Sequence, residues 1–479
     1  MLEERYESYS FWSYFEDINK IPRGTGHTEQ IGDYLVAFAK DNELRFVREE
    51  CGNVIIYASG TEGRESEKPL ILQGHMDMVC VKDPDSTKDL LKDGIEIFVE
   101  DGFVKAKGTT LGADDGIALA YILSVLADPD VSHPPIEALF TVDEEVGMTG
   151  ANGLDSFDLK GKRMINLDNE DDGVIIVGCA GGCTVKSLTP VEWKERSANA
   201  YEIKITGLRG GHSGTDINDM RVSAATIVGR FLAQLKLVRT RIIDVSFGDK
   251  ENAIATSGYI KFICSAPKPD VIEVVEFYAD VMKEEFASKE PDLNFEFNIL
   301  GEMIPVTALH KADSERIMDE ILALPQGVES MSADVPGLVE TSCNVGICRL
   351  TEAGLETTIL VRSSSDSAKQ ALVDKAIAVI NLAGGEAEET EEYPGWEYNK
   401  ESALREHAIK VYKDLYGKEP KVETIHAGLE CGLFLEKISQ LDCISFGPDI
   451  ANAHTTKESL NIESAEKNYD YLVEILKTI

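Results

Sequence analysis

The sequence predicts an α/β fold in two parts: a domain with a mixed, mostly parallel sheet flanked by helices, and a smaller α+β domain inserted into it. Three observations lead to this expectation. The 479 residues exceed what one hydrophobic core usually serves. Strand-like and helix-like patterns alternate at both ends of the chain, which is typical of an α/β domain. The middle of the chain instead combines half-exposed strands with long amphipathic helices.

The first part of the chain supplies most of the expected parallel sheet. Residues 53–58 (NVIIYA) and 69–74 (PLILQG) are short aliphatic runs bounded by turn residues, which predicts strands. Residues 115–126 (DGIALAYILSVL) carry apolar side chains at helical spacing, with a carboxylate in the first turn. Two further aliphatic runs, 136–142 (IEALFTV) and 164–167 (MINL), predict buried strands.

The middle of the chain has a different character. Residues 201–205 (YEIKI) and 259–263 (YIKFI) alternate between apolar and polar side chains, which suits half-exposed strands. Long amphipathic patterns predict helices at 221–237 and 269–286. A strand at 357–361 and a helix at 367–382 complete this block.

A Gly-, Glu- and Pro-rich passage at 384–398 (GGEAEETEEYPGWEY) predicts a crossing point between domains. The α/β pattern then returns, with expected elements at 402–415 (helix), 441–446 (strand) and 463–476 (helix). We therefore expect one α/β domain built from residues 1–186 and 395–479. The inserted domain is expected to span residues 187–394.

The charge of the chain excludes several kinds of partner. With 47 basic and 85 acidic residues the formal net charge is −38, so no nucleic-acid partner is expected, because phosphate contacts require a basic surface. The same charge disfavours an anionic membrane, and no apolar run approaches the ~18 residues of a membrane span. The acidic first residues lack a signal-peptide pattern, and nine scattered cysteines indicate reduced thiols. We expect a cytoplasmic protein.

A histidine and an aspartate end the second predicted strand. Residues 72–79 (LQGHMDMV) place His75 and Asp77 two positions apart, so both project to the same face of an extended chain. At the carboxyl end of a strand in an open α/β sheet, such side chains face the usual ligand crevice. A ligating histidine needs its other ring nitrogen held, commonly by a carboxylate, which Asp77 could supply. A surface histidine and aspartate at a strand end explain the pattern equally well.

Paired aspartates open the next helix. In GADDG (112–116), Asp114 or Asp115 could simply cap the helix and meet the positive end of its dipole. This explanation suits one aspartate better than two, because adjacent carboxylates repel each other unless a cation lies between them. The pair is therefore a candidate for metal binding.

Three acidic residues follow the buried run 136–142. Asp143, Glu144 and Glu145 lie between an apolar strand and a glycine, whereas a run of charges usually marks a solvated face. Neighbouring glutamates suit two separate tasks, one as a metal ligand and one as a general base. Asp168 supplies another carboxylate at a strand end, and His454 lies in a loop before the final helix.

Together these residues predict a metal site. Nitrogen and oxygen ligands without thiolate suit Zn²⁺, with Co²⁺ or Mn²⁺ as possible substitutes. Five scattered ligands are one too many for a single tetrahedral ion. A carboxylate that bridges two ions resolves this count. The candidate ligands are His75, Asp114, Glu145, Asp168 and His454.

These segments resemble the M20 family of co-catalytic zinc peptidases. The motifs occur in the family's order: GHMD (74–77), GADDG (112–116), DEEVG (143–147), NLD (166–168) and the late AH loop (453–454). HAGLECGLF (426–434) and GLRGGHSGTDI (207–217) resemble in particular the bacterial aminoacyl-histidine dipeptidases within that family. The resemblance spans almost the whole chain. It implies that the α/β domain is the zinc-peptidase catalytic domain and that the insert is a lid and dimerisation domain.

The resemblance also implies a role for each candidate. The implied metal ligands are His75 and Asp168 at one zinc, Glu145 and His454 at the other, and Asp114 as the bridge. Glu144 would be the general base, and Asp77 would hold His75. Asp115 stands where relatives may have asparagine, so Asp114 is taken as the bridge by its position in the motif.

Further residues would meet the substrate. His212, in the glycine-rich loop, would stabilise the oxyanion, and in the family this histidine often reaches the other subunit, which implies a homodimer. Arg362 follows a predicted strand and could bind the substrate's free carboxylate in a bidentate manner, and a surface arginine paired with one of the chain's many acids fits the sequence equally well. Gly428 could offer its backbone N–H, and Glu430 a partner for the substrate's amine. Relatives often follow the lid segment Asn-Ala-Ile with Pro and Arg. Here Asn252 begins the same segment, but Ala-Thr-Ser follows it.

The expected function is that of a metallo-exopeptidase with two zinc ions per chain. It would hydrolyse dipeptides, Xaa-His (carnosine-like) and other unblocked ones among them. A tripeptidase or an amide deacylase on the same scaffold is the nearest alternative. A non-catalytic descendant that binds peptides is a further one, although it would have no use for Glu144 as a base.

Overall fold

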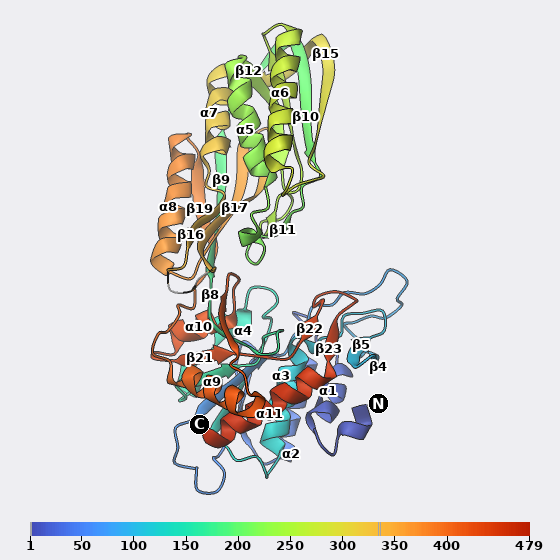
Figure 1. The fold of residues 1–479 in the computed structure, drawn as a ribbon, viewed down its shortest axis with the longest axis vertical. Coiled ribbons are helices and arrows are strands. Elements are labelled where there is room, and N and C mark those ends of the chain that lie inside the picture. The colour runs from blue at the N-terminus through green and yellow to red at the C-terminus, as the bar shows by residue number, and fades with distance from the viewer. Residues whose placement is uncertain (1, 334, 336) are drawn as a thin grey trace. The chain divides into compact units, whose positions relative to one another are not determined.

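The computed structural model describes residues 2–333, 335 and 337–479. The chain divides into two compact units (Figure 1). Unit 1 comprises residues 1–178, 396–424 and 429–479, and unit 2 comprises residues 179–395 and 425–428. None of the helices among the described residues is both long and apolar enough to cross a membrane. None of the nine cysteines, all of them described, forms a disulfide.

Unit 1 is built on a mixed eight-stranded sheet. Neighbouring strands of this sheet are hydrogen-bonded in the following spatial order: β1 (Arg45–Arg48), β2 (Val54–Ala58), β6 (Ile136–Thr141), β3 (Leu70–His75), β7 (Arg163–Asn166), β21 (Asp442–Ser445), β8 (Val174–Cys179) and β20 (Lys421–Ile425). The four strands β6, β3, β7 and β21 pair in parallel, whereas β1, β2 and β8 pair antiparallel with their neighbours. The predicted mixed α/β sheet is confirmed, and its parallel part consists of these central strands.

The central strands and one helix form the core of unit 1. All six residues of β3 and of β6 are buried, as expected for parallel strands covered on both faces. Helix α3 (Ala113–Ala127) is apolar on all sides and buried along nearly its whole length, so it packs against both β3 and α1 (Phe11–Asn19). The other helices of unit 1 are α2 (Glu29–Asp41), α4 (Thr149–Gly153), α9 (Ala403–Tyr416), α10 (Glu430–Lys437) and α11 (Ile462–Thr478).

A second, four-stranded sheet lies within unit 1. Its spatial order is β22 (Ile450–Ala451), β23 (Ser459–Asn461), β5 (Phe103–Ala106) and β4 (Ile97–Glu100).

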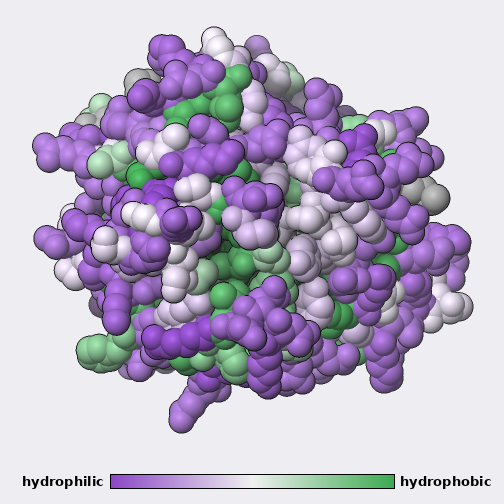
Figure 2. Space-filling view, turned by 90° about the horizontal axis from the view of Figure 1, so that it is seen from below, coloured by the Kyte–Doolittle hydropathy of each residue, from purple (hydrophilic) through white to green (hydrophobic). Residues whose placement is uncertain are grey.

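The face drawn in Figure 2 is covered mostly by hydrophilic side chains, with hydrophobic residues gathered in smaller areas between them. This distribution fits the large excess of acidic residues.

Unit 2 is built on a nine-stranded antiparallel sheet. Eight strands follow the order β15 (Asn294–Leu309), β10 (Trp193–Thr206), β14 (Gly258–Cys264), β12 (Thr240–Phe247), β17 (Val339–Leu350), β18 (Gly354–Ser363), β9 (Gly181–Pro190) and β19 (Glu386–Tyr393), and β16 (Gly327–Met331) pairs with β17. Helices α5 (Ala224–Leu237), α6 (Lys268–Phe286), α7 (Lys311–Ala323) and α8 (Asp366–Leu382) lie over the same face of this sheet (Figure 1). The sequence therefore predicted its α+β character correctly.

The passage 384–398 contains an edge strand that was not expected and also a boundary between the two units. The passage was expected to be a crossing point, and unit 1 resumes within it at Trp396. The residues before this boundary form the edge strand β19, which pairs with β9. Its glutamates hide the strand pattern, and charged side chains on an edge strand discourage pairing with other molecules. The chain first leaves unit 2 after Gly395 and returns to it for residues 425–428. Whether 1–186, 187–394 and 395–479 behave as separate folding domains stays a prediction.

Candidate functional site

Three parallel strands of unit 1 end at the same edge of the sheet, and polar residues follow each of them. His75 is the last residue of β3, and Asp168 comes two residues after the end of β7. Glu144 and Glu145 follow β6 closely. Because parallel strands present their carboxyl ends at one edge, these side chains meet at the edge of the sheet where α/β proteins usually bind ligands.

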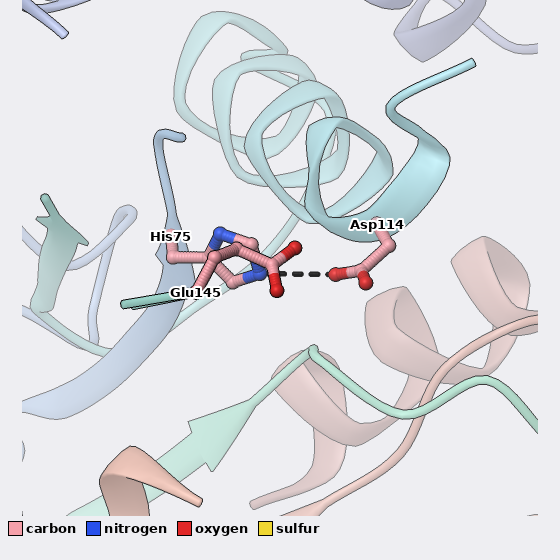
Figure 3. Close-up of side chains that lie close together, drawn as sticks. All are labelled: His75, Asp114 and Glu145. Carbon is pink, nitrogen blue, oxygen red and sulfur yellow. Dashed lines mark hydrogen bonds and ion pairs between the residues drawn. The ribbon is translucent and has the colours of Figure 1, made fainter. Parts of the chain in front are cut away.

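Asp114 lies between two histidines. Its Oδ1 is 3.0 Å from Nε2 of His75, and its Oδ2 is 3.0 Å from Nε2 of His454. His75 comes from β3, Asp114 from the start of α3, and His454 from the loop after β22. Figure 3 shows His75, Asp114 and Glu145 converging from separate elements. One carboxylate therefore offers one oxygen to each of two imidazoles.

The remaining candidate ligands complete two neighbouring groups. Oε1 of Glu145 is 3.0 Å from Nε2 of His454, and Oδ1 of Asp168 is 3.5 Å from Nε2 of His75. The ligand atoms of His75, Asp114 and Glu145 lie within 4.8 Å of one another, as do those of His75, Asp115 and Asp168. All five predicted ligands thus lie in one cluster of unit 1.

The cluster holds more negative charge than its two imidazoles balance. Burial raises the pKa of Asp168 to about 6, although His75 opposes this shift. Burial also raises the pKa of Glu144 well above its usual range. The hydrogen bond with Asp114 and the contact with Glu145 raise the pKa of His454 to about 11. Buried carboxylates in such excess are stabilised by bound cations.

Asp77 connects His75 to the loop of acidic residues. The side chain of Asp77 is fully buried, and its Oδ1 is 3.3 Å from Nδ1 of His75. Its two oxygens also accept hydrogen bonds from the backbone N–H groups of Glu144 (3.0 Å) and Glu145 (3.3 Å). Oδ2 accepts a third, from the Thr25 hydroxyl (2.8 Å). Asp77 thereby orients the imidazole and the two glutamates together.

Asp115 has a different environment from Asp114. Its Oδ2 accepts a hydrogen bond from the backbone N–H of His75 (3.2 Å) and lies directly above Gly74, where a Cβ atom would come within 2.6 Å of it. Asp115 is buried, and burial raises its pKa. Asp115 contacts the backbone of His75 and lies near Asp168, on one side of the cluster. It therefore does not lie between the two histidines as Asp114 does.

Two buried charged residues that were not predicted hold the loop carrying Asp114. The carboxylate of Glu458 accepts hydrogen bonds from four consecutive backbone N–H groups, those of Leu111, Gly112, Ala113 and Asp114. The guanidinium of Arg23 donates to the carbonyl oxygens of Met76 and Asp77 (3.1 and 2.8 Å) and to that of Gly112. Neither residue belongs to a recognisable motif, so only the folded chain reveals them.

Glu430 lies beneath the strand ends. It is the first residue of α10 and is fully buried, and its Oε2 accepts hydrogen bonds from Gln73 (2.7 Å) and Thr141 (2.8 Å). Burial raises the pKa of Glu430 to about 8. Its other oxygen, Oε1, has no hydrogen-bond partner among the described residues. Its contact with the substrate's amine stays a prediction.

His212 of unit 2 presents a single tautomer. It lies in the short strand β11 (Gly211–His212), which pairs with β13 (Ala253–Ile254). Its Nδ1 accepts hydrogen bonds from the N–H groups of Gly214 (3.3 Å) and Thr215 (3.2 Å), which places the ring proton on Nε2. Burial, together with the charge of Arg362, lowers the pKa of His212. The ring is therefore neutral, with a donor at Nε2.

Arg362 and its neighbours form a second group of polar residues in unit 2. Arg362 is buried in β18; its Nη1 donates to the Tyr393 hydroxyl (2.6 Å), while its Nε has no partner among the described residues. His426, also buried, shares a hydrogen bond of 2.7 Å with Ser342. Asn252 precedes β13 and accepts a hydrogen bond at its backbone oxygen from Ser213 (2.9 Å). The half-buried Gly428 is the last residue of this unit.

Comparisons with known proteins show which family and which solved structures the chain resembles. The family described as Peptidase family M20/M25/M40 matches residues 71–478. The cytosol non-specific dipeptidase of Escherichia coli (strain K12) is 37% identical over 472 residues, which cover 98% of this chain and 97% of the relative. The crystal structure of aminoacylhistidine dipeptidase from Vibrio alginolyticus superposes with a TM-score of 0.90 at 35% identity, over 98% of this chain and 96% of the other.

A more distant structure shares the fold. Aminopeptidase PepT from Bacillus cereus ATCC 10987 has a TM-score of 0.57 at 17% identity, and the alignment covers 98% of this chain and 97% of the other.

Proposed function

The chain belongs to peptidase family M20/M25/M40, and from this membership we propose that it is a metal-dependent dipeptidase acting on Xaa-His and other unblocked dipeptides. The observation that carries the proposal is the position of Asp114, which offers one oxygen to each of two histidines 3.0 Å away. The dipeptidases of Escherichia coli and Vibrio alginolyticus support the choice of substrate, because the alignments cover nearly the whole of each chain.

The proposed site holds two zinc ions per chain, which Co²⁺ or Mn²⁺ could replace. His75 and Asp168 would bind one ion, and Glu145 and His454 the other. Asp114 would bridge them. The donor set fits this role, since it consists of imidazole and carboxylate groups that converge in a strongly acidic, largely buried cluster.

In the proposed reaction, zinc would polarise the scissile carbonyl and acidify the attacking water. The carboxylate of Glu144 would take the proton from this water and pass it to the departing amine. Asp77 would keep His75 in one orientation and hold the backbone of Glu144 and Glu145. Glu144 and its neighbour would therefore divide proton transfer and metal binding between them.

Unit 2 would contribute to binding of the substrate. The neutral His212 would donate from Nε2 to the developing oxyanion. The Nε of Arg362 has no hydrogen-bond partner in the part of the chain that the structure describes. This supports a contact with the substrate's carboxylate, because a buried donor of this kind is stabilised by an anionic acceptor. Asn252 and Gly428 of unit 2 and Glu430 of unit 1 are the remaining candidates for substrate contacts.

The proposal includes a homodimer and a cytoplasmic location. In this family the histidine in the position of His212 often serves the other subunit, which is the reason to expect a dimer. The word cytosol in the name of the Escherichia coli relative supports the location. Unit 2 would serve as the lid and dimerisation domain.

A kinetic panel tests the proposed function. Purified protein would be assayed with Xaa-His dipeptides, other dipeptides, tripeptides and N-acyl amino acids, before and after chelation. We expect free dipeptides to have the highest kcat/KM and chelation to abolish turnover. Faster cleavage of tripeptides would favour a tripeptidase, and preference for acylated amines would favour an amide deacylase. Turnover of none of them would favour a non-catalytic peptide-binding protein.

A further inference from the structure

Unit 2 contains a cavity with a strongly basic lining. Its volume is about 520 Å³, and it lies where β10, β12 and β14 meet the start of α7. Four cationic side chains line it: Arg196, Arg239, Arg241 and Lys311. Glu315 is the acidic residue of the lining. The lining therefore has a formal excess of three positive charges in a chain whose net charge is −38.

The three arginines of the cavity are not paired with acids. Arg196, Arg239 and Arg241 form no ion pair with any described residue, whereas Lys311 lies 3.7 Å from Glu315. Four other arginines of unit 2 are paired with acids: Arg221 with Asp216 (2.9 Å), Arg230 with Glu285 (2.6 Å), Arg316 with Asp313 (2.8 Å) and Arg349 with Asp249 (2.8 Å). Arg209 and Arg362 form no ion pair with a described residue, but they lie outside the cavity. Arg196 and Arg239 are exposed and Arg241 is half-buried, so all three can be reached by an anion from solution. In a chain where acidic residues outnumber basic ones by 85 to 47, three arginines without acidic partners in one cavity are an unusual local excess of positive charge.

Two of the guanidinium groups, those of Arg196 and Arg241, repel each other. Nη1 of Arg241 is buried and has no hydrogen-bond partner among the described residues. Burial and the charge of Arg196 lower the pKa of Arg241. A buried donor without an acceptor is unfavourable, and a like charge nearby adds to the cost. An anion bound between Arg196 and Arg241 would accept a hydrogen bond from the unsatisfied donor and would offset the repulsion between the two guanidinium groups.

The rest of the lining is neutral and partly apolar. Ala198, Ile263, Ala266 and Met303 contribute apolar surface, and Ser197, Asn199 and Ser265 contribute uncharged polar groups. The volume falls within the ~300–1,000 Å³ of typical small-molecule sites and exceeds what a bare inorganic ion fills. Planar guanidinium groups match the oxygens of a phosphate in a bidentate geometry.

We propose that this cavity binds a phosphorylated small molecule, with its phosphates between Arg196, Arg239 and Arg241 and its organic part against Ile263 and Met303. The inference goes beyond the proposed dipeptidase function. All residues that line the cavity belong to unit 2, and none of them is a candidate metal ligand, catalytic residue or substrate contact.

Equilibrium binding tests the proposal. The full-length, zinc-loaded protein would be titrated with ATP, with pyrophosphate and with citrate by calorimetry, in excess Mg²⁺ so that the phosphates do not remove the zinc. We expect ATP and pyrophosphate to bind, ATP more tightly, and citrate at least about tenfold more weakly than either phosphate. The double variant R196Q/R241Q should lose at least about tenfold in affinity for ATP, with an unchanged kcat/KM for dipeptides.

A matched variant controls for net charge. K204Q/K283Q removes two positive charges from unit 2 outside the cavity and should bind ATP like the unmodified protein. No binding of either phosphate would overturn the proposal, as would citrate binding as tightly as pyrophosphate. If R196Q/R241Q binds ATP as tightly as the unmodified protein, the phosphates bind elsewhere. The same conclusion follows if K204Q/K283Q loses as much affinity for ATP as R196Q/R241Q does. Loss of dimers in R196Q/R241Q without ATP binding to the unmodified protein would assign the arginines to a subunit interface instead.

Discussion

Neighbouring acidic residues have sharply different surroundings. Asp114 contacts two imidazoles, whereas Asp115 accepts a hydrogen bond from the backbone of His75. Glu145 lies 3.0 Å from His454, while the pKa of Glu144 is raised by burial. Adjacent residues on a turn point in different directions, so one sequence motif can supply both a ligand and a base.

Replacing Glu144 by glutamine separates these two tasks. E144Q should lower kcat for dipeptides by about 10²–10⁴-fold, because the amide cannot accept the proton of the attacking water. Its metal content, measured by mass spectrometry, should stay that of the unmodified protein, since Glu144 is not a proposed ligand. D143N is the matched control, because the side-chain oxygen of the new asparagine can still accept the hydrogen bond from Gly26. Unchanged turnover in E144Q would refute the proposed base.

The sequence revealed the cluster but not its supports. His75, Asp114, Glu145, Asp168 and His454 were predicted because each ends an element or begins one within a recognisable motif. Arg23 and Glu458 were missed because their partners are backbone groups 53 or more residues away, and such contacts leave no local pattern. The choice between Asp114 and Asp115 rested on the motif alone. The contacts with both histidines now support Asp114 on geometric grounds.

Periodicity located most elements of the fold but misjudged one edge. The strand expected at 69–74 is β3, and the helix expected at 115–126 is α3. In both cases the expected and observed ends differ by at most two residues. β19 was missed because its glutamates disguise an edge strand, whose outer side needs no apolar partner. Pairing order within the sheets could not be predicted, since it depends on contacts between distant segments.

Helix α7 carries a buried carboxyl group, that of Glu320, whose one hydrogen bond among the described residues comes from the sheet of unit 2. Oε1 of Glu320 accepts from the Thr189 hydroxyl (2.9 Å), and burial raises the pKa of Glu320 from 4.5 to about 7. The folded chain therefore holds this proton more tightly than the unfolded chain. The stabilisation that results is fully present below about pH 4.5 and is lost as the pH rises through about 7.

The variant E320Q should remove this pH dependence, because glutamine keeps the acceptor oxygen and does not ionise. Relative to the unmodified protein, its free energy of unfolding should rise by on the order of 1–3 kcal/mol between about pH 5 and pH 8. Denaturant titrations at both pH values measure this difference. D319N, an exposed neighbour on α7, should show no such trend. A constant difference between E320Q and the unmodified protein would mean that Glu320 ionises normally.

At the scale of the whole molecule, the proposed dimer makes His212 a residue of the partner's active site. Mixing two inactive variants tests this arrangement. E144Q and H212A chains, unfolded together and refolded, should form mixed dimers in which one of the two sites has both Glu144 and His212. With random pairing about half of the dimers are mixed, and each mixed dimer has one complete site of two. About a quarter of the unmodified activity should therefore return.

The homodimers define the background of the mixing experiment. E144Q and H212A refolded separately should stay inactive, and ultracentrifugation should find particles of twice 52.6 kDa. Activity that does not rise on mixing would show that His212 serves its own chain. Monomeric particles would remove the dimer from the account.

The central claim is that two metal ions share Asp114, and stepwise metal replacement tests it most directly. Protein stripped with a chelator would be given zinc in measured amounts, with bound zinc determined by mass spectrometry and dipeptide turnover followed at each step. We expect full turnover only as bound zinc approaches two ions per chain. The variant D114N should keep less than two ions and lose most of its turnover. Full activity with one ion or none would contradict a site with two shared metal ions.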